Sequence, residues 1–215
     1  MRVALNSTMA GAGLAVLLAA CGIAPALAAD KSNPDWPCVQ RKVEELGVGQ
    51  IWDGPEVVPD KAPWADDDKI KDLLPVLTSR KVPLADAETA IKKFAAAQPA
   101  ADRDAKLTLL FAAMFETTNN QRKTVLGGLE KYLKAQRQRA AEVEKQGTDL
   151  DKMREKTGLD DAAEAELAKA QEAFDWSTRI FQERQSNIPV ACEVPTMIEQ
   201  RLYGVVKIIR AAMSK

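Results

Sequence analysis

Apolar residues recur at intervals of three and four along most of the chain, which is the spacing of one face of an α-helix. The first run follows the triplet Asp66-Asp67-Asp68, whose carboxylates suit the free N–H groups and positive dipole at a helix start. A second run begins after Pro83, and a third begins near Asp102. The pattern therefore predicts an all-α fold, with a helical domain over residues 64–215.

The third run leads into two heptad stretches separated by a reversal. Their apolar or small positions alternate in steps of three and four: Leu126, Leu129, Leu133, Gln136, Ala140 and Val143 in the first, and Ala163, Leu167, Ala170, Phe174, Ser177 and Phe181 in the second. Between them, Gly147 to Asp161 is predicted to be the far end of a hairpin. The two stretches predict an antiparallel coiled-coil-like hairpin over roughly residues 121–187, with arms of about 35 Å. Because the stretches are adjacent and similar in length, we expect the seam to close within one chain.

Two positions near this hairpin are less regular. The polar stretch Thr117–Asn120 is either a bend or an exposed turn of one long helix. A final helix is predicted to start near Pro195, because proline suits the first turn of a helix. Its apolar residues then fall on a single face.

Residues 29–63 are interrupted by proline and glycine almost throughout, apart from a short helix predicted at Cys38–Leu46. This Pro/Trp-rich N-terminal segment contains Trp36 and Trp52, and Trp64 follows it directly. Large aromatic side chains in such segments bury much area against a folded body, so we interpret it as an arm that packs on the helical domain. A tryptophan-lined ligand slot is the alternative interpretation.

Residues 1–28 have the features of a secretory signal peptide. Arg2 is followed by the uncharged stretch Met9–Ile23 and then by small residues, Ala24–Ala28, of the kind that a signal peptidase recognises. The uncharged stretch is shorter than the roughly 20 apolar residues that a membrane-spanning helix needs. No later segment is longer, so we expect a protein without a transmembrane span, located in the periplasm or secreted.

A second processing pattern overlaps the first. Leu18–Cys21 also matches the motif at which lipoproteins are cut, in which case Cys21 would carry lipid and anchor the chain in the cell envelope. A polar tether usually follows such a cysteine, whereas here the chain stays apolar up to Ala29. We therefore favour cleavage after Ala28, and a membrane tether is expected only if Cys21 is lipidated.

Either cut leaves Cys38 and Cys192 as a pair in an oxidising compartment, where disulfides persist. A bond between them would close a loop of about 155 residues, for which the chain-entropy model gives at most about 5 kcal/mol. It would pin the N-terminal segment to the last helix. The alternative is two unpaired cysteines that act as small apolar residues.

The composition excludes several kinds of chemistry. The chain contains no histidine, which removes the commonest general base and the usual zinc and haem ligands. No CxxC pair, G-x-G-x-x-G motif or P-loop is present. Asp149 and Asp151 are followed by Arg154 where a calcium loop requires glycine. We therefore expect no catalytic residue, no metal and no cofactor, and a protein that is not an enzyme.

The charge argues against binding to nucleic acid. Arg2 is the only charged residue among the first 28, so the processed chain has 29 basic and 31 acidic residues and a formal charge of −2. A general nucleic-acid binder would present a strongly basic face. The many alanine and long charged residues are instead typical of helices.

Residues 174–204 mix aromatic and charged side chains close to the predicted disulfide. The candidate interaction surface comprises Trp176, Arg179, Arg184, Glu199 and Arg201. A network of ion pairs that ties the last helix to the base of the hairpin is the alternative interpretation. Together with DWPCVQRKV at 35–43, this stretch resembles small uncharacterised exported helical proteins of Gram-negative bacteria. The resemblance implies a location in the cell envelope and no particular activity.

These patterns together predict an exported periplasmic protein whose helical hairpin serves as a structural or adaptor module, with another envelope protein as its partner. Two alternatives stay open. One is a protein that binds a small ligand in a pocket between the Trp-rich arm and the terminal helices. The other is a lipoprotein held to a membrane through Cys21.

The two processing patterns predict different mature proteins. If cleavage follows Ala28, we expect the intact mass of the mature protein to equal that of an unmodified chain starting at Ala29. Lipidation would instead give a chain that starts at Cys21 and is heavier by its acyl groups. Mass spectrometry of the protein purified from its own cells distinguishes the two, and an acylated start would overturn the later cut.

Overall fold

The computed structural model describes residues 36–57, 63–156 and 160–214. The expected signal peptide and the candidate lipid anchor Cys21 lie outside the described residues. Regular structure within the described ranges is entirely helical, which confirms the predicted all-α class. The elements are α1 (Val48–Ile51), the short 3-10 helix η1 (Pro63–Asp66), α2 (Asp68–Thr78), α3 (Leu84–Ala96), α4 (Arg103–Arg154), α5 (Asp161–Ser186) and α6 (Ile188–Ala211).

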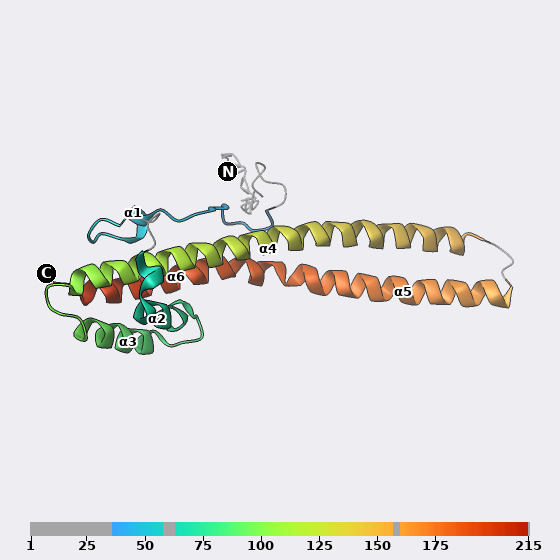
Figure 1. The fold of residues 1–215 in the computed structure, drawn as a ribbon. Helices are drawn as coiled ribbons and strands as arrows, with labels where there is room; N and C mark the ends of the chain where they lie inside the picture. The colour runs from blue at the N-terminus through green and yellow to red at the C-terminus, as the bar shows by residue number, and fades with distance from the viewer. Residues whose placement is uncertain (1–35, 58–62, 157–159, 215) are drawn as a thin grey trace, which may run out of the picture.

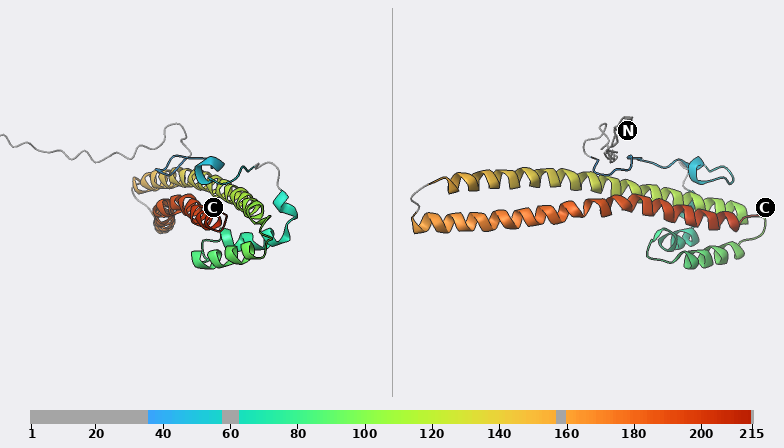
Figure 2. Two further views of the ribbon diagram at one scale, coloured as in Figure 1. Left: turned by 90° about the vertical axis from the view of Figure 1, so that its left-hand side faces the viewer. Right: turned by 180° about the vertical axis from the view of Figure 1, so that it is seen from behind.

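A long antiparallel helical hairpin runs the length of the molecule (Figure 1). Its first arm is α4, whose 52 residues extend about 78 Å at 1.5 Å per residue. The returning arm consists of α5 and α6, which meet at Asn187. The backbone of Asn187 is itself helical (φ −84°, ψ −12°), so the two helices form a nearly continuous rod beside α4 (Figure 2). The hairpin is thus longer than the predicted 121–187, because it continues through the base of the molecule.

The seam of the hairpin follows the predicted heptads. On α4, Leu126, Leu129 and Gln136 are buried, and Leu133, Ala140 and Val143 are half-buried. On α5, all six predicted seam positions from Ala163 to Phe181 are half-buried, and most of their neighbours are exposed. Each helix thus covers one stripe of the other, as two-stranded packing requires.

The structure decides one open alternative, at Thr117–Asn120, and corrects two predicted helix boundaries, near Gly147 and near Pro195. Thr117–Asn120 is part of α4 without a break, and α4 also passes through Gly147 and ends only at Arg154. The last helix begins at Ile188 and not near Pro195, which lies buried inside α6. A proline inside a helix removes one backbone hydrogen bond, and burial of the apolar face around it compensates for that loss.

The base of the hairpin is thickened by α2 and α3, which pack beneath α4 and α6 (Figure 1). Their buried apolar residues, Ile70, Leu77, Ala87, Ile91, Phe94 and Ala95, meet the apolar faces of α4 and α6 in one core. Asp67 caps α2 by accepting a hydrogen bond from the Ile70 amide, and it forms an ion pair with Lys106 of α4 (2.7 Å). The cap therefore also ties α2 to the hairpin.

The N-terminal arm packs along the opposite side of α4, as predicted for a Pro/Trp-rich segment (Figure 2). The Trp52 ring stacks on Phe111 of α4, with 4.1 Å between ring centroids. The helix predicted at Cys38–Leu46 does not form, and the arm's one α-helix in the described residues is α1. The reason is tertiary: α4 side chains, from Asn119 and Arg122, bond the backbone of this segment in place of helical hydrogen bonds.

The Asp67–Lys106 pair predicts a pH dependence of stability. The hydrogen bond from Lys106 is the main reason that the pKa of Asp67 lies below its ordinary 3.8. The ion pair therefore stabilises the fold fully above pH 3.8. This stabilisation is lost as the pH falls through the pKa of Asp67 in the folded protein, which lies below 3.8. We expect Asp67→Asn, which keeps a capping oxygen, to lower the free energy of unfolding by about 0.5 kcal/mol at neutral pH and by less in acid, in urea titrations followed by circular dichroism.

Asp67→Ala is the matched variant, because it removes the cap as well as the charge. It should cost about 1 kcal/mol more than Asp67→Asn at every pH. A difference between the wild type and Asp67→Asn that did not change with pH would contradict the assigned ion pair.

Candidate interaction surface

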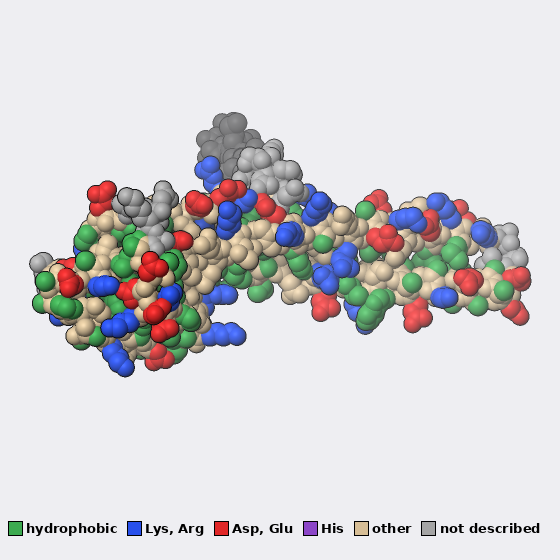
Figure 3. All heavy atoms as spheres, in the orientation of Figure 1, with side chains coloured by type: hydrophobic (Ala, Val, Ile, Leu, Met, Phe, Trp, Pro, Cys, Tyr) green, Lys and Arg blue, Asp and Glu red, His purple; other side chains and the backbone are tan. Residues whose placement is uncertain are grey.

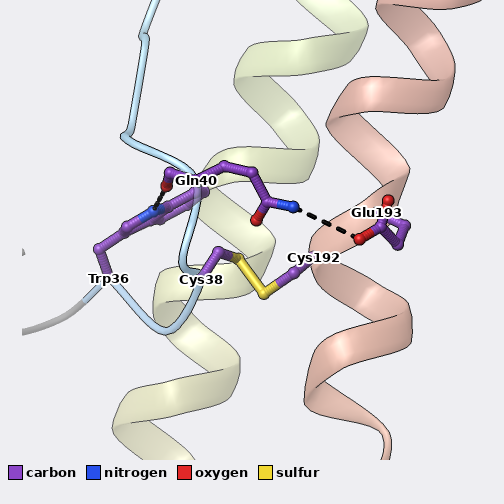
Figure 4. Close-up of a disulfide and its surroundings, with 5 residues drawn as sticks. All are labelled: Trp36, Cys38, Gln40, Cys192 and Glu193. Carbon is purple, nitrogen blue, oxygen red and sulfur yellow. Dashed lines mark hydrogen bonds between the residues drawn. A yellow bond between two sulfur atoms is a disulfide. The ribbon is translucent and has the colours of Figure 1, made fainter. Parts of the chain in front are cut away.

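A disulfide joins the N-terminal arm to the hairpin near its middle. Cys38 and Cys192 of α6 are bonded, with 5.5 Å between their Cα atoms, as the sequence predicted (Figure 4). Both cysteines are buried in a small apolar cluster with Trp36, Leu126, Leu129 and Ile188. The Gln40 amide of the arm also donates a hydrogen bond to the Glu193 carboxylate beside the disulfide (3.3 Å). The N-terminal arm is therefore attached to both α4 and α6.

A buried arginine lies at the same level, and the sequence analysis did not single it out. Arg122 of α4 is only 2% exposed. Its Nε and Nη2 donate to Glu199 of α6 (2.9 and 2.8 Å), while Nη2 also reaches the Val43 carbonyl (3.0 Å) and Nη1 the Glu44 carbonyl (3.5 Å). One planar guanidinium thus connects α4, α6 and the arm. The signal was present in the sequence: Arg122 occupies an apolar-stripe position of the α4 repeat.

Two residues of the predicted interaction surface are engaged within the chain. Glu199 accepts from Arg122, as described above. Arg201 is half-buried and donates to the backbone carbonyls of Leu77, Val82 and Val76 (2.7, 2.8 and 2.9 Å), which closes the end of α2 and the loop to α3. Burial lowers the pKa of this guanidinium below its ordinary value. Glu199 thus forms an ion pair of the kind that the alternative interpretation expected, whereas the contacts of Arg201 are hydrogen bonds to backbone carbonyls.

The other three residues of that surface lie on α5, away from this network. The Trp176 side chain is 61% exposed, and Arg179 and Arg184 are also exposed. The backbone carbonyl of Arg184 accepts a hydrogen bond from the Tyr132 hydroxyl of α4 (2.8 Å). The five candidates therefore divide into an internal pair and an outward-facing group on α5.

The tryptophans of the arm do not line an open slot. Trp36 and Trp52 are buried, and their indole N–H groups donate to the carbonyls of Gln40 and Pro55. Trp64 is half-buried and donates to Glu116 of α4 (2.9 Å). A surface cleft of about 650 Å³ lies elsewhere, between the α2–α3 loop, α4 and α6, and no tryptophan lines it. The rings therefore attach the arm, which is the first of the two interpretations.

Beyond Gln136, the hairpin becomes a bare pair of helices. The Gln136 side chain is buried in the seam and donates to the Phe181 carbonyl (3.1 Å) and to Gln185 (3.3 Å). Further out, Leu150 is the one fully buried residue described on α4, and α5 has none. The remaining surface of this pair, which we call the distal arm (residues 137–154 and 161–178), carries exposed charges of both signs (Figure 3).

The contacts of Arg122 predict how much this residue contributes to the attachment of the N-terminal arm. We expect Arg122→Ala to lower the free energy of unfolding by about 3 kcal/mol, because it leaves Glu199 and two arm carbonyls without their partner. The Leu46 amide, which donates to Asn119 on the next turn of α4, should also lose protection from hydrogen exchange. Arg139→Ala is the matched control on the exposed face of α4 and should change stability by less than about 0.5 kcal/mol. A loss for Arg122→Ala as small as that of the control would contradict the role of this residue.

Comparison of the chain with protein-family models, with curated proteins and with solved structures gave no match. Within the ranges that the structure describes, no cluster of three or more acidic or cysteine side chains is arranged to hold a metal ion. No described helix combines the length and apolar character needed to cross a bilayer.

Proposed function

We propose that the protein is an exported periplasmic adaptor that presents a long helical hairpin to another envelope protein. The observation that supports this proposal is the distal arm. From Gln136 to Arg154 the helix pair extends about 27 Å further, and no other described element packs on it. The large apolar core lies around α2, α3 and the proximal parts of α4 and α6, and it includes no residue of this extension.

The distal arm has the properties of a rigid presenting surface. Ion pairs one turn apart support α4 there: Lys145–Asp149 (2.7 Å), Lys152–Asp149 (3.5 Å) and Arg154–Asp151 (3.2 Å). Each such pair contributes a few tenths of a kcal/mol to the helix. The disulfide and the Arg122–Glu199 ion pair hold the hairpin near its middle, between the base and the distal arm, so the direction of the distal arm is set by the body. A partner that binds the distal arm is therefore placed at a fixed distance from the rest of the protein.

Photo-crosslinking in intact cells tests this function. A photoreactive phenylalanine derivative replaces Glu144 on α4 or Glu164 on α5, both exposed on the distal arm, and in a third variant replaces Thr89, which is exposed on α3 of the body. We expect the two distal positions to give an adduct whose added mass belongs to a different polypeptide, and the Thr89 control to give none.

The masses of the adducts distinguish binding to another protein from self-association. A distal adduct with another envelope protein supports the adaptor function. No adduct from either distal position, or equal yields from the distal and Thr89 positions, would contradict it. An adduct with twice the mass of this chain would show self-association and would not support an adaptor.

A further inference from the structure

An apolar stripe lies on the rod of α5 and α6, on the side turned away from α4. Trp176, Val190 and Met197 are 61%, 69% and 40% exposed, and Ile180 and Val194 beside them are half-buried. At about 100° per residue, these five positions fall within roughly one quarter to one third of the helix circumference. We call them the outer stripe. Large apolar side chains grouped in this way on a charged helix mark a surface that another molecule covers.

The outer stripe continues a face that is already covered closer to the base. Further along the same side of α6, Ile198 and Val205 are buried, and Arg201 bonds the loop between α2 and α3. At Gly204, the Leu84 side chain of α3 lies 3.3 Å from the position that a Cβ would take. The cover formed by α2 and α3 ends near Met197, whose sulfur contacts Arg80 of the α2–α3 loop (3.8 Å). Beyond this point, the equivalent face is open.

The residue order along this face is self-complementary. Positions 176, 180, 183, 187, 190 and 194 are spaced 4, 3, 4, 3 and 4, so the spacing is the same from either end. The outer positions are apolar, and the two central positions are the exposed residues Glu183 and Asn187. If two copies cross antiparallel about residue 185, Trp176 meets Val194 of the other copy and Ile180 meets Val190. Glu183 then meets Asn187, whose amide can donate to the carboxylate.

The charges beside the stripe have the same symmetry. Along the rod, Glu172 comes first, then Arg179, then Glu193, and Arg80 stands beside Met197 at the far end. An antiparallel crossing brings Arg179 near Glu193 of the other copy, and Glu172 near its Arg80. Each of these contacts joins opposite charges and occurs twice in a two-fold dimer. Such complementarity selects both the partner and the register.

We propose that a second copy of this chain covers the outer stripe and forms an antiparallel two-fold dimer through α5 and α6. The seam with α4 remains within each chain, and the new interface is separate from it. In the dimer the two hairpins point in opposite directions from a shared centre. The assembly goes beyond the adaptor function, because it displays two distal arms, and it stands whether or not a partner binds those arms.

Sedimentation equilibrium of the purified, disulfide-bonded protein tests the dimer. We expect the wild type to dimerise, and the double substitution Trp176→Glu/Val190→Glu to raise the dissociation constant at least about tenfold, because it places a charge in each of the apolar contacts on either side of the polar centre. Tyr203→Ala is the matched control: Tyr203 is 50% exposed but lies on the opposite side of the rod. It should leave the dissociation constant unchanged.

A charge exchange tests the register. Arg179→Glu and Glu193→Arg should each weaken the dimer, because each opposes like charges at both symmetric contacts. An equal mixture of the two variants should form heterodimers of nearly wild-type affinity, since both contacts then join opposite charges again. Melting curves followed by circular dichroism verify that each variant is folded.

A monomer at all concentrations up to about 100 μM, a range in which specific interfaces are populated, would overturn the proposal. A dimer that is unaffected by Trp176→Glu/Val190→Glu would overturn it as well, because another surface would then be responsible. Neither result would affect the adaptor function, which depends on the distal arm and on an adduct with a different protein.

Discussion

The structure depends on the packing of α4 against the rod of α5 and α6 along one apolar seam. The apolar seam runs the whole length of both rods, from the base to the distal arm, so each rod needs the other to bury it. Side chains of matching size and polarity along the seam allow the helices to pack closely. Gly147 lies opposite Phe174, whose ring is 3.3 Å from the position of a glycine Cβ, and Gln136 satisfies its buried amide with the facing backbone. A heptad seam of this kind holds two helices together but gives no reason for a third.

Other segments pack on the hairpin at its base, so the molecule is wider there than along the distal arm. The helices α2 and α3 cover one side of the proximal hairpin, and the tryptophan-bearing arm covers another. At the boundary between the thick and thin parts, the Cys38–Cys192 disulfide and the Arg122–Glu199 ion pair fasten three segments at one level. The distal part is therefore supported from a fixed base, although few of its own residues are fully buried.

The two proposed surfaces differ in chemistry and adjoin at Trp176, where the distal arm ends and the outer stripe begins. The distal arm is long, charged and covered by no described element, whereas the outer stripe on α5 and α6 is apolar, self-complementary and continuous with a face that α2 and α3 cover. A charged, extended surface suits a reversible contact with another protein. A palindromic apolar stripe instead suits a copy of the same chain.

The sequence by itself determined the all-α class and the heptad seam of the hairpin, because both follow from the order of apolar residues. From residue type it favoured the attachment of the arm through tryptophan over a ligand slot, and the pairing of Cys38 with Cys192 over two unpaired cysteines. Only the tertiary structure decided that Cys38–Leu46 is irregular rather than helical, that Pro195 lies inside a helix, and that Arg201 is internal. Each of these outcomes depends on hydrogen-bond partners or apolar contacts from segments distant in the chain, and a one-dimensional pattern does not contain the positions of such partners.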